Sequence, residues 1–150
     1  MTDEILALSY CEATHQHAML ADNGVTSWLY LHGPSVNAQK TGPVIATAFA
    51  YSRIDPIPVS EVKEYQPEPP PIAIGYATKT AVCDDPSKSK WHLTWSTDGA
   101  CVLLLRDDQP WCLVHPSHMR GCSKSIDKTG PWGDPWSETL FQDVQWPLHK

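Results

Sequence analysis

The sequence predicts an α+β fold: an antiparallel sheet of about five to six strands, an N-terminal helix and a short C-terminal helix. Three observations carry this prediction. Residues 4–21 contain neither Gly nor Pro. Residues 90–115 contain strand-like segments separated by tight turns, and Asp134-Pro135 precedes an apolar stripe of helical spacing. The 150 residues fit one domain spanning 1–150, because a chain of this size buries enough surface to fold without disulfides.

The N-terminal helix is expected over residues 4–21, which are rich in good helix formers. One helical stripe of that segment would comprise Leu6, Tyr10, Ala13, His17 and Leu20. An alternative is a hairpin, because Asn23-Gly24 supplies the positive φ angles that such turns need. Both interpretations make residues 25–31 a strand.

The middle of the chain predicts short strands joined by an extended connection. Alternating small and bulky residues indicate a strand over 43–51, and 72–78 is a further strand candidate. Six prolines between residues 55 and 71 forbid a regular helix there. We therefore expect this segment to run over the surface.

Residues 90–115 predict a three-stranded antiparallel meander, the clearest structural signal in the chain. Asp98-Gly99 and residues 107–110 form its turns, and 101–105 is apolar on both faces, as in a central strand. Near the C-terminus, Asp134 can cap a helix through about Val144 that has Pro135 at its first position.

Composition and charge exclude several classes of function. A net charge of −6 argues against nucleic-acid binding, which needs basic residues to neutralise phosphates. No apolar run is long enough to span a bilayer. The acidic start of the chain is unlike a secretory signal, and five scattered cysteines are unlike a disulfide framework. The sequence therefore predicts a cytoplasmic protein without membrane association.

The pattern C-x2-H-x2-H-x3-C offers the best candidate metal site. Its residues are Cys112, His115, His118 and Cys122, which are ligand types that zinc accepts tetrahedrally. Two observations argue against zinc. Structural zinc sites usually combine two short ligand pairs separated by a longer span, which this spacing lacks. Strand alternation would also place the Cys112 and His115 side chains on opposite faces. The alternative is a packed cysteine with loop histidines in solvent.

A second cluster comprises Cys11, His15 and His17. On a helix, Cys11 and His15 would share a face and suit a cysteine-dependent enzyme. No acidic or amide residue can be assigned to orient the histidine, so no catalytic residue is predicted. A packed thiol and two surface histidines explain the cluster equally well.

Seven tryptophans in 150 residues suggest either a β-rich core or a recognition surface. Trp132, Trp136 and Trp146 lie in a Gly/Pro-rich tail and are the candidate anchors for a partner. By elimination of catalytic templates, we expect a small acidic protein-binding or regulatory module of the inhibitor or immunity-protein type. Its expected partner is a basic protein, matched by charge.

Overall fold

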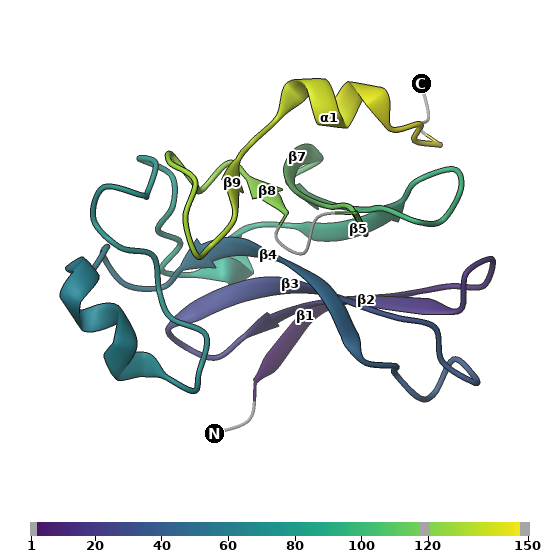
Figure 1. Ribbon diagram of the computed structural model, residues 1–150, viewed down its shortest axis with the longest axis horizontal. Helices are drawn as coiled ribbons and strands as arrows, with labels where there is room; N and C mark the ends of the chain where they lie inside the picture. Colours follow the sequence, from purple (N-terminus) through teal and green to yellow (C-terminus); the bar gives the residue numbers. More distant parts are fainter. Residues whose placement is uncertain (1–2, 118–120, 148–150) are drawn as a thin grey trace.

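The computed structural model describes residues 3–117 and 121–147, and their architecture is mostly β. A four-stranded sheet and a five-stranded sheet pack face to face, and a short helix covers the outer side of the second sheet (Figure 1). From bottom to top in Figure 1, the layers are β1–β4, β5–β9 and α1.

The first sheet is an antiparallel meander in the order β1-β2-β3-β4. Its strands are β1 (Glu4–Cys11), β2 (Gln16–Asp22), β3 (Thr26–His32) and β4 (Val44–Ser52). The turn between β2 and β3 contains Gly24 at a φ of 92°, a conformation that favours glycine. The predicted strands over 25–31 and 43–51 are confirmed.

The predicted N-terminal helix is wrong, because residues 4–22 form the β1–β2 hairpin. His15 adopts a φ of 59° in the turn that reverses the chain. In β2, Ala18 and Leu20 enter the core between the sheets, while His17 and Met19 face the other side. Burial on alternate positions therefore overrides the helix propensity of the segment. The hairpin alternative at Asn23-Gly24 is the correct one.

The second sheet contains the predicted meander, which is confirmed. It begins with β5 (Trp91–Trp95), β6 (Val102–Arg106) and β7 (Gln109–Val114). The two-residue strands β8 (Cys122–Ser123) and β9 (Asp134–Pro135) extend it, and β9 pairs with β8 in parallel. Leu103 and Leu104 are fully buried on opposite faces of β6, as expected of an interior strand.

The connection between the sheets carries two 3-10 helices, η1 (Val59–Tyr65) and η2 (Pro86–Lys88). Prolines flank η1 on both sides and limit it to a short turn-like element. The strand predicted over 72–78 is reduced to isolated bridges, such as Ile57 to Ala73. This connection packs Ile72 and Ala73 against Trp28 and Phe49 at one end of the first sheet.

The predicted fold class is therefore wrong in two respects. Two sheets of four and five strands replace one sheet of five to six, and the only α-helix in residues 3–117 and 121–147 is α1 (Glu138–Asp143). The C-terminal helix is confirmed but begins later, since Asp134-Pro135 pairs with β8 and the Ser137 hydroxyl caps α1 by accepting from the Leu140 N–H at 3.1 Å. Across the described ranges, no helix has the length and apolar character needed to cross a bilayer.

Candidate functional site

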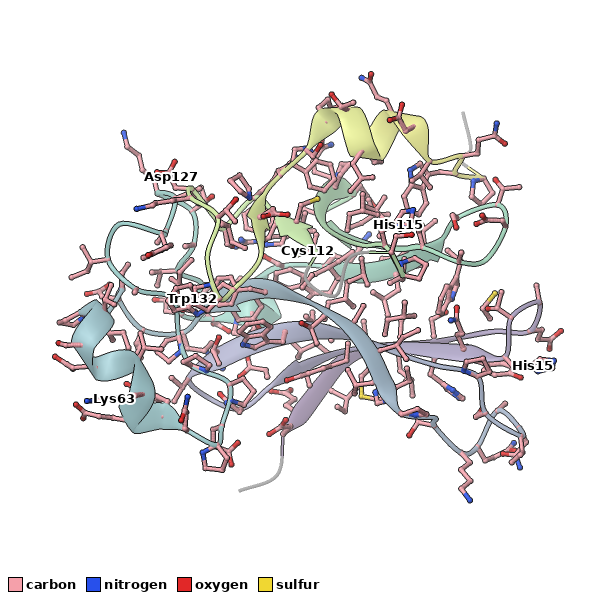
Figure 2. The ribbon with its side chains drawn as sticks, viewed as in Figure 1. His15, Lys63, Cys112, His115, Asp127 and Trp132 are labelled. Carbon is pink, nitrogen blue, oxygen red and sulfur yellow. The ribbon has the colours of Figure 1, made fainter. Side chains whose placement is uncertain are left out.

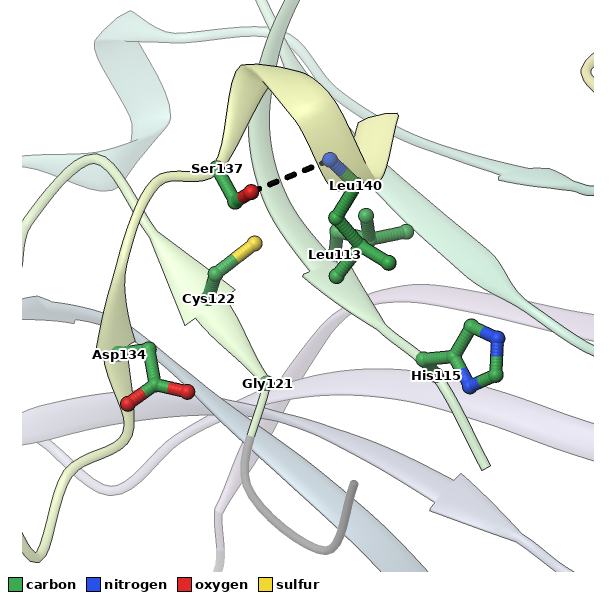
Figure 3. Close-up of a pocket in the computed structure, with 7 residues that line it drawn as sticks. All are labelled: Leu113, His115, Gly121, Cys122, Asp134, Ser137 and Leu140. Atoms are coloured by element: carbon green, nitrogen blue, oxygen red, sulfur yellow. Dashed lines mark hydrogen bonds between the residues drawn. The ribbon is translucent and has the colours of Figure 1, made fainter. Parts of the chain in front are cut away.

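A pocket of about 240 Å³ lies between α1 and the ends of β7 and β8 (Figure 3). The side chains in it that carry chemistry are Cys122, His115, Asp134 and Ser137. Alternation along β7 and pairing of Leu113 with Cys122 put His115 and Cys122 on the same outer face of the sheet. In Figure 3 the thiol points toward α1, and His115 and Asp134 flank it from opposite sides.

The Cys122 thiol is not activated for nucleophilic chemistry. Burial raises the pKa of Cys122, and the negative charge of Asp134 raises it further. The backbone N–H of Ser137 lowers that pKa but does not reverse the shift. Since the thiolate is the reactive species, a buried thiol with a raised pKa is a packing group.

His115 lines this pocket and is bonded to the backbone through one ring nitrogen. Its Nδ1 accepts a hydrogen bond from the backbone N–H of Ser117 at 3.0 Å, so the Nδ1 lone pair is engaged by the backbone. His115 also lines a second hollow with Asp98 and Asp143. The imidazole thus lines two hollows, of which the first contains one carboxylate, Asp134, and the second contains two.

The candidate zinc ligands are only partly brought together. Cys112, which Figure 2 labels, packs in the core between the sheets, where its S–H donates to the Phe49 carbonyl at 3.3 Å. Cys122 instead packs in the cluster beneath α1 (Figure 3). His118 lies outside the described residues. Within 3–117 and 121–147, no group of three or more His, Cys, Asp or Glu side chains is arranged to hold a metal ion. The zinc hypothesis stays a prediction that metal analysis of the purified protein tests.

Cys11, His15 and His17 lie at or beside the β1–β2 turn, and Figure 2 shows His15 at the right end of the molecule. The Tyr10 ring contacts both histidines, with centroid distances of 6.4 Å to His15 and 4.7 Å to His17. His15 Nδ1 is 2.9 Å from the Tyr10 hydroxyl, and His17 Nε2 is 2.8 Å from the Ala38 carbonyl oxygen. Cys11 packs against Gly99, where a Cβ would lie only 2.8 Å from the sulfur. The helical geometry that suggested a nucleophile pair does not exist.

The three candidate tryptophan anchors occupy different environments. Trp132 is 2% exposed and its Nε1 donates to the Pro71 carbonyl, so it belongs to the core. Trp136 and Trp146 are half-buried and pack with Phe141 against the outer side of the second sheet. Their indole N–H groups bind Glu138 and the Phe141 carbonyl. Of the three, Trp136 and Trp146 therefore keep part of their surface exposed.

The outer side of the first sheet presents a different kind of surface, which we call the open face. Cross-strand register places Leu8, Met19, Tyr30 and Thr47 in one row, with Ile5 beside them. Ile5 is 47% and Leu8 62% exposed. Tyr30 is partly buried against the cluster that includes Val62 of η1, so the exposed apolar side chains among these residues are those of Ile5 and Leu8 on β1. Exposed apolar side chains grouped on a sheet face are typical of a contact surface.

Negative charge gathers at one end of the open face. A hollow of about 350 Å³ is lined by the carboxylates of Asp3, Glu64 and Glu68. Burial first, and then the charges of Asp3 and Glu68, raise the pKa of Tyr30 to about 12. Asp3 and Glu68 therefore lie near enough to Tyr30, a member of the row, for their charges to add to the effect of its burial.

The sequence contains little signal for this surface. Asp3 and Glu68 are far apart in the chain, and only the folded connection through η1 brings them together. The alternation of side chains between the two faces of β1, which would identify the strand, is interrupted by a bulge between Ile5 and Ala7. Comparisons of the chain with protein-family models, with curated proteins and with solved structures found no match.

Proposed function

We propose that this protein is a small, non-catalytic protein-binding module of the inhibitor or immunity-protein type, and that its open face binds a basic partner. The observation that carries the proposal is the row of Leu8, Met19 and Tyr30, which is exposed at its Leu8 end, with the carboxylates of Asp3, Glu64 and Glu68 at one end of the open face. Such a surface matches a partner segment with apolar side chains and a Lys or Arg.

The two parts of the surface have different roles in binding. Ile5 and Leu8 supply apolar area whose removal from water drives association. The carboxylates steer a cationic partner and fix its register, because complementary charges raise the association rate and exclude acidic competitors. The net charge of −6 adds a long-range field of the same sign.

The thiols support a role without catalysis. Burial raises the pKa of Cys83, Cys101, Cys112 and Cys122. All five cysteines are free thiols. We also place the protein in the cytoplasm, since reduced thiols fit a reducing compartment. The acidic balance supports a partner that is neither nucleic acid nor membrane.

A peptide selection tests the proposal and needs no purified partner. A randomised peptide library is selected on the wild-type protein and counter-selected on a Leu8→Asp variant, which keeps the fold because Leu8 is 62% exposed. We expect the enriched peptides to combine apolar residues with Lys or Arg. Their binding should fall at least about tenfold in the Glu64→Lys/Glu68→Lys variant, because the charge pairing becomes repulsion.

Glu138→Lys on α1 is the matched control, because it reverses one exposed charge on the opposite side of the molecule. Binding should be unchanged in this variant. Selected peptides that lack basic residues, or that bind the Leu8→Asp and wild-type proteins equally, would overturn the proposal. Loss of binding in Glu138→Lys alone would indicate that the binding surface lies at the C-terminal tryptophans.

A further inference from the structure

A cationic pocket of about 520 Å³ lies beside the β6–β7 hairpin. Three basic side chains line it, Lys79, Arg106 and Lys124, although the whole chain has only eleven Lys and Arg. Thr80 and Gln109 add polar groups that can donate hydrogen bonds, and one carboxylate, Asp107, is present. Positive charge therefore concentrates here in a protein that is acidic overall.

Arg106 is fixed in place before any ligand arrives. Its guanidinium carbon lies 5.2 Å from the ring centroid of Trp91 and 4.8 Å from that of Trp111. Nε donates to the Ser89 hydroxyl at 3.0 Å, and Nη2 lies 3.7 Å from Cys83 Sγ. The two indoles are anchored in turn, by bonds of Trp91 Nε1 to the Pro86 carbonyl and of Trp111 Nε1 to the Ala50 carbonyl.

Within residues 3–117 and 121–147, Arg106 forms no ion pair with a carboxylate. The salt bridge among these residues joins Arg53 to Asp22, and it involves neither Lys79 nor Lys124. The nearby Asp107 carboxylate instead accepts the backbone N–H of Lys90 at 2.7 Å. A held guanidinium with unused N–H groups is suited to the bidentate recognition of a carboxylate or phosphate.

We propose that this pocket binds a small organic anion. Its carboxylate or phosphate group lies against Arg106, with Lys79 and Lys124 completing the positive surroundings. Its apolar part contacts Trp111 and Val82, which line the same pocket. This ligand is distinct from the basic protein partner, because the charges that recognise it have the opposite sign and belong to different residues.

The test uses defined probes and two nuclear magnetic resonance signals, the Arg106 Nε–H and the Trp111 indole N–H. Benzoate, phenyl phosphate and inorganic phosphate are titrated separately, with benzyl alcohol as the neutral probe. We expect benzoate or phenyl phosphate to shift both signals, while benzyl alcohol does not. The comparison between the two aromatic anions identifies the acidic group. Affinity should weaken as ionic strength rises from about 0.01 M to about 0.15 M, because the Debye length falls from about 30 Å to about 8 Å.

Variants of the basic residues test where the anion binds. Arg106→Lys keeps the charge but loses the fork of donors, and we expect binding to weaken at least about tenfold. If this variant does not fold, the double variant Lys79→Gln/Lys124→Gln tests the proposal instead, and we expect a similar weakening of anion binding. Lys63→Gln on η1 is the matched control and should bind like wild type. The proposal is overturned if no anion shifts the two signals, if benzyl alcohol shifts them equally, or if Lys63→Gln weakens binding as much as the double variant.

Discussion

The hydroxyl of Tyr51 on β4 donates a 2.6 Å hydrogen bond to the carboxylate of Asp22 at the end of β2. Both side chains are buried, and Arg53 completes the group with a 3.1 Å ion pair to the same carboxylate. Asp22 also accepts the backbone N–H of Gly24 and so joins the β2–β3 turn to the edge of the first sheet. This network leaves a buried charge fully paired, which is the condition under which such a charge is tolerated.

Tyr51→Phe removes the hydroxyl and leaves the Asp22 carboxylate with one donor fewer. We expect the free energy of unfolding to fall by about 1.5–3 kcal/mol, the range for hydrogen bonds to charged groups. Chemical denaturation of the purified variant measures it. Tyr10→Phe is the matched control, because the Tyr10 hydroxyl contacts His15 at an exposed site and its loss should cost less than about 0.5 kcal/mol.

Alkaline pH should destabilise the protein from about pH 9 upward. Burial, and then the charge of Asp98, raises the pKa of Cys101 from an ordinary value of 9.0 to about 11. The folded state therefore holds this proton more tightly than the unfolded state. Its contribution to stability is complete below pH 9 and is lost between pH 9 and 11, by at most about 1.4 kcal/mol per pH unit.

Denaturation curves recorded across this pH range for wild type and Cys101→Ala test the effect. The variant should show a shallower decline between pH 9 and 11. Tyr30→Phe should flatten the curve at higher pH, between about 10 and 12, because the pKa of Tyr30 is raised to about 12. Identical slopes in wild type and Cys101→Ala would contradict the assignment of the proton to this thiol.

Asp108→Gly should stabilise the β6–β7 hairpin. Asp107 and Asp108 form its two-residue turn with φ angles of 51° and 68°, which side chains with a Cβ adopt at a cost. We expect a gain of about 0.5–1 kcal/mol in the free energy of unfolding. Asp107→Gly is the informative comparison, since it also removes the bond to the Lys90 N–H and should gain less or nothing.

Thiol labelling of the native protein should modify Cys11 first. Cys11 is half-buried, whereas the other four cysteines are buried. Iodoacetamide at neutral pH should therefore add one label rapidly, and the remaining four only after unfolding, as read by intact mass. Rapid native labelling at Cys122 would instead indicate a reactive thiol in the pocket beneath α1 and would contradict its raised pKa.

The sequence predicts those parts of the fold whose local signals agree with their burial. Residues 90–115 combine strand-like segments, two turns and an apolar central segment, and the structure contains each of these features in β5, β6 and β7. The segment 4–21 misleads because its residues favour helix locally, while the inter-sheet core selects Ala18 and Leu20 on one face. No local pattern reveals that β4 ends one sheet and that a second begins at β5.

The candidate site is predictable from the sequence only in its chemistry. Net charge led to the proposal of a basic partner, but the sequence does not show that Asp3, Glu64 and Glu68 come together, because they meet through tertiary structure. The tryptophan count suggests a recognition surface, whereas Trp91 and Trp111 instead hold Arg106. Aromatic residues in a strand are compatible with core, ligand and partner contacts, and the sequence does not separate these roles.

Among the described residues, β1 pairs with β2 alone, so its second row of backbone N–H and C=O groups is unmatched. Ile5 and Leu8 lie on this same strand and are exposed. An apolar sheet margin of this kind is a template for strand addition by another copy of the chain. We therefore expect the solubility limit of the protein to be set at β1, where the charges of Glu4 on the strand and Glu12 just after it oppose stacking into aggregates.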